Sequence, residues 1–223
     1  MDEVERLAEA IKAGRTEDAA ALLAEDPSLV DGRNLDGVSY LLLAMYYRRG
    51  EIVQLLRRRR QRLDVFESAA LGDLNALTAA LRENSELVNA YSRDGFTPLG
   101  LAAFFGRSEM VRALVRLGAR VNAPSRNSFK VAPLHSAVAS RDVESVRALL
   151  EAGADTAARQ QKAVTALHGA AMNGDATIVD LLLAHGADAS AVMEGGSTAL
   201  ELARKGNHEG VIRLINAHAE GRS

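Results

Sequence analysis

The sequence contains no cysteine, and only four prolines and nine aromatic residues (four Tyr, five Phe) among its 223 positions. Without thiols the chain cannot form disulfides, thiolate zinc or iron–sulfur sites, or a cysteine nucleophile. This absence fits a reducing compartment. The first six residues, MDEVER, are acidic where a signal peptide is basic and then apolar. No apolar run approaches the ~20 residues of a membrane span. We therefore expect a cytoplasmic protein without membrane partners.

Charge is nearly balanced, with 27 Lys and Arg against 29 Asp and Glu and a net charge of -2. Such a chain has no overall attraction for nucleic acid, so a nucleic-acid partner is not expected. Apolar residues make up 48% and charged residues 25%, which is typical of a soluble globular protein. Alanine and leucine dominate, and both favour helix.

Internal repeats organise the chain. The segments that begin at Thr97, Ala132, Thr165 and Thr198 share a Thr/Ala-Pro/Ala-Leu pattern at nearly equal steps. Each of the first three is followed, at the same distance, by a Gly-Ala pair. A second relation makes the N-terminal half a tandem copy of one larger block, because Glu9, Gly14 and Asp36-Gly37 return as Glu67, Gly72 and Asp94-Gly95. Together these relations predict seven units, starting near residues 3, 36, 64, 94, 129, 163 and 196.

One unit shows why the pattern predicts a pair of helices. Thr97 suits an N-cap and Pro98 the first helical position, where its missing N–H costs nothing. A second helix is expected from about residue 109, with an apolar stripe at Val111, Leu114 and Val115. Gly118 then suits the position after the helix, which requires positive φ. A pair this short cannot bury its own apolar surface, so the units must stack.

These motifs resemble the ankyrin-repeat family, of the bacterial type, over roughly residues 3–219. The resemblance implies an all-α solenoid of about seven helix–turn–helix units with short β-hairpin fingers and a concave groove. It further implies a single solenoid over residues 1–223, with cap units at 1–35 and 196–223 and central units at 36–195. The polar segment from Glu220 to Ser223 and the acidic residues Asp2 and Glu3 would belong to these caps.

The chain departs from the family pattern at several places. Gly100 and Glu201 replace the histidine of the motif, and Arg60 stands in the register of Gly118. No finger fits between Arg62 and Val65, so the second unit should run directly into the third. The finger at positions 122–131 is slightly longer than the others.

No motif predicts catalysis. His135 and His168 are motif histidines at helix starts, for which we expect structural hydrogen bonds. No histidine pair has metal-site spacing, and no serine lies in a nucleophile elbow. The glycine-rich segment 193–198 lacks the lysine of a phosphate loop and is typical of a turn. We therefore expect no enzyme, cofactor, metal or small-molecule substrate.

The largest charge cluster is Arg57-Arg58-Arg59-Arg60, with Arg62, Arg48 and Arg49 nearby. Two interpretations stay open: a patch for nucleic acid or an acidic partner, and a solvated helix face whose cations stabilise a helix C-terminus. Successive helical residues point about 100° apart, so four arginines cannot line one surface, which favours the solvated face.

Aromatic residues gather at positions that, by the resemblance, line or border the concave groove. Large apolar side chains that stacking does not bury indicate a binding surface. The alternative is that they pack between units, in the gap left by the missing finger. The predicted groove has an apolar N-terminal half and a hydrophilic C-terminal end, and suits a monomeric module for a protein partner with an apolar anchor and acidic groups. Its candidate partner-binding residues are Tyr46, Tyr47, Arg93, Phe96, Phe104, Phe105, Phe129, Lys130, Met172, Asn173 and Lys205.

Overall fold

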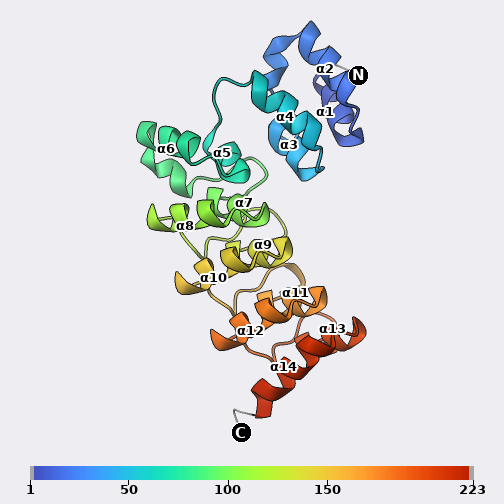
Figure 1. Ribbon diagram of the computed structural model, residues 1–223, viewed down its shortest axis with the longest axis vertical. Helices are drawn as coiled ribbons and strands as arrows, with labels where there is room; N and C mark the ends of the chain where they lie inside the picture. Colours follow the sequence, from blue (N-terminus) through green and yellow to red (C-terminus); the bar gives the residue numbers. More distant parts are fainter. Residues whose placement is uncertain (1–2, 221–223) are drawn as a thin grey trace.

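A computed structural model describes residues 3–220, within which fourteen α-helices form seven consecutive antiparallel pairs (Figure 1). This confirms the all-α solenoid of seven units. Asp2 and residues 221–223, assigned above to the caps, lie outside the described residues. The pairs are α1 (Glu3–Ala13) and α2 (Thr16–Glu25), α3 (Tyr40–Tyr46) and α4 (Gly50–Arg59), α5 (Val65–Leu71) and α6 (Leu74–Glu83), α7 (Pro98–Phe104) and α8 (Ser108–Arg116), α9 (Pro133–Ser140) and α10 (Val143–Glu151), α11 (Ala166–Asn173) and α12 (Ala176–Ala184), and α13 (Ala199–Lys205) and α14 (Glu209–Glu220). Three 3₁₀ helices, η1 (Pro27–Asp31), η2 (Ser85–Asn89) and η3 (Gln161–Ala163), lie in the connections.

Local sequence signals set the helix ends. The Thr97 hydroxyl accepts a hydrogen bond from the amide of Gly100 at 3.0 Å, and Pro98 is the first residue of α7. After α8, Gly118 adopts a φ of 85°, which glycine reaches without steric cost. Glu201, which replaces a motif histidine, closes a capping box with Thr198 instead. The helix boundaries therefore follow from residues within each unit.

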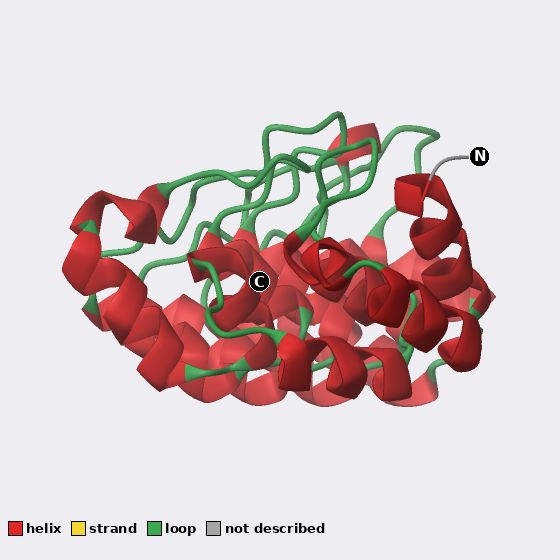
Figure 2. Cartoon of the chain, turned by 90° about the horizontal axis from the view of Figure 1, so that it is seen from above, coloured by secondary structure: helices red, strands yellow, loops and turns green. Residues whose placement is uncertain are grey.

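The fingers form a layer of loops along one side of the helices (Figure 2). Among the described residues they contain isolated β-bridges, such as Gln160 with Val164, rather than continuous strands. Backbone hydrogen bonds join neighbouring fingers: Arg126 N to Gly95 O at 2.8 Å, and Gln161 N to Phe129 O at 2.9 Å. A Cβ at Gly95 would lie 2.8 Å from the amide nitrogen of Asn127, so the long finger can approach only because residue 95 is glycine.

The tandem copy seen in the sequence is also visible in the packing. Arg49 Nε donates to the carbonyl of Lys12 at 3.1 Å, and Arg107 Nε donates to the carbonyl of Ala70 at 2.9 Å. Arg49 and Arg107 are equivalent positions of the two copies, and so are Lys12 and Ala70. Units one and two thus share this contact with units three and four.

The stack is interrupted between the second and third units. Residues 60–64 connect α4 to α5 without a finger, as the sequence predicts, and the first two pairs stand apart from the others in Figure 1. Outer helices α8, α10, α12 and α14 pack in succession, whereas α4 and α6 make at most marginal contact. The buried apolar residues accordingly form one cluster in units one and two and another in units three to seven. A small cluster, Leu42, Met45, Ala70 and Leu101, lies between them.

The two motif histidines are buried and act structurally. His135 Nε2 donates to the carbonyl of Val164 at 3.1 Å and so ties its helix to the next finger. His168 Nδ1 accepts from the amide of Thr165 at 3.3 Å, within its own unit. Burial lowers the pKa of both side chains below the ordinary value for histidine.

We therefore expect the free energy of unfolding to fall as the pH drops below about 6.5. In that range His135 and His168 bind protons in the unfolded chain but stay neutral in the folded protein. Urea unfolding at pH 7.5 and 5.5 measures this difference. The variant His135→Gln/His168→Gln should show a smaller difference between the two pH values. An equal difference in both proteins would assign the pH dependence to other groups.

Candidate functional site

Four aromatic rings of the second and fourth units lie together, three of them at the C-terminal ends of α3 and α7 and one on the finger before α7; we call them the aromatic cluster. Tyr46 ends α3, Phe96 precedes α7, and Phe104 and Phe105 follow one another at the end of α7. The Tyr46 ring centroid lies 5.8 Å from that of Phe104 and 5.4 Å from that of Phe105. Phe96 and Phe104 are 6.5 Å apart. These distances are in the range of favourable aromatic pairs.

Part of the aromatic cluster packs between units rather than facing solvent, which is the alternative considered for these residues in the sequence. Tyr46, Phe96 and Phe105 are only partly exposed and pack on the small apolar cluster between the two blocks of units. The Tyr46 hydroxyl donates to Asp94 Oδ2 at 2.6 Å. Burial, together with the negative charge of Asp94, raises the pKa of Tyr46 above its ordinary value, so the hydroxyl stays protonated as a donor.

Other predicted binding residues are open to solvent. The exposed fraction is 39% for Phe104, 45% for Tyr47, 56% for Phe129 and 62% for Met172. Phe129 lies on the long finger, and Met172 lies two units beyond Phe104, in α11. These side chains are available to a partner without any change in the fold.

The polar candidates lie on separate units. Arg93 and Lys130 are exposed on two fingers. Asn173 donates to the carbonyl of Val138 at 3.3 Å, which makes it a link between units, and Lys205 donates to Ser197 Oγ at 3.4 Å. The structure thus brings together Tyr46, Phe104 and Phe105 of units two and four, while Asn173 and Lys205, the predicted hydrophilic end of the groove, lie in units six and seven.

The arginine run does more than form a solvated face. Arg57 pairs with Asp73 at 3.0 Å, and Arg62 pairs with Glu83. Arg60 pairs with Glu67 and lies 3.2 Å from Asp31. Since Asp73, Glu67 and Glu83 belong to the third unit, these arginines join the two blocks where the finger is missing. Sequence reasoning missed these carboxylates, because nothing in their spacing pairs them with the run.

The pair formed by Arg60 and Glu67 is buried. Their side chains are 7% and 0% exposed. Burial raises the pKa of Glu67, as does the neighbouring Asp64 carboxylate, while Arg60 opposes both effects. A buried charge pair of this kind is sensitive to the loss of either partner.

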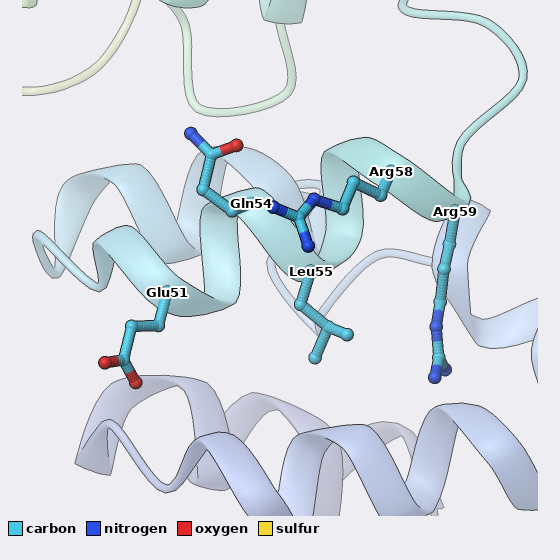
Figure 3. A pocket seen from close by; sticks show the side chains of 5 residues that line it. All are labelled: Glu51, Gln54, Leu55, Arg58 and Arg59. Carbon is cyan, nitrogen blue, oxygen red and sulfur yellow. The ribbon is translucent and has the colours of Figure 1, made fainter.

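Arg58 and Arg59 are exposed, and no ion pair is found for either within residues 3–220. Figure 3 shows that Glu51, Leu55 and Arg59 extend to one side of α4, whereas Arg58 leaves the helix in another direction. These side chains border a shallow recess. Because all of them come from α4, the recess is a furrow along one helix rather than an enclosed site.

Within residues 3–220, no three His, Asp or Glu side chains come together as a metal site would require. No helix in that range has the length and apolar character to cross a membrane.

Two comparisons relate the chain to known proteins. A family model described as ankyrin repeats (3 copies) matches residues 65–160 and 134–222, together more than half of the chain. The human DNA-binding protein RFXANK is 41% identical over 71 residues, which are 32% of this chain. The match spans 27% of the length of that protein.

Proposed function

The chain belongs to the ankyrin-repeat family, and from this premise we propose that it is a non-catalytic module that presents a preformed groove to a protein partner. Ankyrin repeats generally act in protein–protein interaction. We further propose that the module forms one solenoid, works as a monomer and acts in the cytoplasm. A rigid stack loses little conformational entropy on binding, which favours affinity.

One observation carries the proposal: large apolar side chains remain exposed along the stack. Tyr47, Phe104, Phe129 and Met172 expose between 39% and 62% of their surface. Phe104 and Phe105 make an edge-to-face contact with ring centroids 5.1 Å apart. Phe105 packs on the small apolar cluster and so holds the exposed Phe104 ring in place. Rigid aromatic anchors of this type dominate the energetics of interfaces.

The double variant Tyr47→Ala/Phe104→Ala is expected to weaken binding of the captured partner by at least about 2 kcal/mol, the scale of interface hot spots. The partner is first isolated by affinity capture from the host and identified by mass spectrometry, and its affinity is then measured by titration calorimetry. Leu117→Ala is the matched control, because Leu117 is 51% exposed at the end of outer helix α8. Equal affinities for both variants would show that the partner binds elsewhere.

The alternative is a factor that binds nucleic acid or an acidic partner through arginines 57–62, and the relative described as DNA-binding favours it. Against it, Arg57, Arg60 and Arg62 are already paired with carboxylates of the chain. A steep fall of DNA affinity with salt, reduced by Arg58→Glu, would support this alternative.

A further inference from the structure

A groove with a volume of about 1130 Å³ opens between outer helices α4 and α6, where the second and third units diverge. We call it the junction groove. Its apolar lining includes Val30 from η1, Leu63 from the connection, and Ala76, Ala79 and Ala80 along α6. The groove belongs to the outer helices and to the connection between the blocks, so it is distinct from the exposed residues Tyr47 and Phe104.

The groove exists because a helix neighbour is missing. In the units from the fourth onward, each outer helix packs on the next one, whereas α6 makes at most marginal contact with α4 and with α8. A repeat unit cannot bury its apolar face alone and depends on its neighbours to cover it. Along α6, Ala79 is exposed, whereas Ala76 and Ala80 are half-buried against the two core clusters. Small side chains of this kind allow another backbone to approach closely.

Arginines outnumber carboxylates among the residues that line the groove. Five arginines, Arg33, Arg57, Arg59, Arg60 and Arg62, face three carboxylates, Asp31, Asp64 and Glu83, whereas the chain has a net charge of -2. Four of the five arginines pair with carboxylates of the chain. Arg59 is left over, exposed and without an ion pair among residues 3–220. Asp73 and Glu67, which lie outside the lining, neutralise Arg57 and Arg60. The lining thus combines an apolar wall with one unpaired arginine, Arg59, at its edge.

We propose that the junction groove binds an acidic amphipathic helix of a protein partner, which takes the place of the missing outer-helix neighbour. A helix about 10 Å wide fills the volume of the groove over roughly two to three turns. Its apolar stripe would lie on the alanines of α6, and its carboxylates would face Arg59. A nucleic acid fits less well, because it would need unpaired cations at several phosphates and gain nothing from the apolar wall.

The test uses a fluorescein-labelled peptide of about 14 residues with leucines at positions i, i+3, i+4 and i+7 and glutamates elsewhere. Fluorescence anisotropy should show saturable binding to the full chain, and the same peptide with lysines for glutamates should bind at least about tenfold more weakly. Tyr47→Ala/Phe104→Ala should bind the peptide normally, which separates this site from the proposed groove for the main partner.

Two matched pairs of variants locate the site. Arg59→Glu should weaken the acidic peptide about tenfold, while Arg58→Glu, the exposed neighbour that does not line the groove, should change binding less than about twofold. Ala79→Glu should abolish binding. Ala21→Glu, at the equivalent position of the first copy of the repeated block, should not. Circular dichroism checks that each variant keeps the helix content and melting temperature of the parent.

Several results would overturn the proposal. They are equal binding of the acidic and lysine peptides, absence of binding up to about 1 mM, or equal effects of Arg58→Glu and Arg59→Glu. Dependence of DNA binding, rather than peptide binding, on Arg59 would assign the groove to nucleic acid. A dimer that Ala79→Glu dissociates in sedimentation equilibrium would assign it to a second copy of the chain.

Discussion

Replacing Arg60 by alanine is expected to lower the free energy of unfolding by about 3–5 kcal/mol at neutral pH, because the Glu67 carboxylate is then left buried without its counter-ion. Glu67 is fully buried and Arg60 nearly so. Urea unfolding at pH 7 measures the loss. Arg58→Ala is the matched control, since Arg58 is exposed two positions earlier, and it should change stability by less than about 0.5 kcal/mol.

The pH dependence of the stability of the Arg60→Ala variant also tests whether Glu67 has lost its counter-ion. The pKa of Glu67 is already raised in the folded protein, and loss of the Arg60 charge raises it further. As the pH falls through this raised pKa, the folded variant takes up a proton more readily than the unfolded chain, so its deficit relative to the parent shrinks. Replacing both partners by leucine should recover most of the lost stability. A deficit below about 1 kcal/mol for Arg60→Ala would show that the pair contributes little.

Truncation of Leu101 to alanine is expected to cost about 2–5 kcal/mol and to separate unfolding into two transitions. Leu101 is completely buried, and it lies in the small apolar cluster that links units one and two to units three to seven. Its loss should therefore weaken the coupling between the two blocks as well as the local packing. Unfolding followed by circular dichroism, together with hydrogen exchange of residues 3–59, measures both effects.

Leu99→Ala is the matched control for this variant. Leu99 lies two positions earlier in the same helix and is 1% exposed, but it packs within the core of units three to seven. A similar total loss is expected, without early exchange of the first two units. If both variants unfold in one transition with the same exchange pattern, the small cluster does not control the coupling of the blocks.

Repetition and local chemistry made the architecture predictable from the sequence. The regular return of the motif at Thr97, Ala132, Thr165 and Thr198 indicates the helix pairs. Thr97 and Gly118 mark helix ends because their effects act within a few positions of the chain. The absence of a finger after Arg62 was also predictable, because too few residues separate Arg62 from Val65 to form one.

The candidate site was predictable only in part. The residues after the inner helices stand out as aromatic in units two and four, yet their burial differs, with Tyr47 exposed and Tyr46 packed against Phe105. Adjacent positions at a helix end point in different directions, so whether a ring is buried or exposed depends on which residues lie opposite it. For Tyr46 the opposing residues are Phe104 and Phe105 of the fourth unit, which it contacts although the third unit lies between them in the chain.

Glu9 and Glu67 show most clearly what only the tertiary structure decided. They occupy equivalent positions in the two copies of the repeated block, yet Glu9 is 51% exposed and pairs with the nearby Lys12, while Glu67 is fully buried against Arg60. The sequence by itself determined the units, the ends of their helices and their order, because these depend on contacts within one unit. The buried ion pair, the divided core and the junction groove depend on how the second unit meets the third, which is set by contacts between residues distant in the chain.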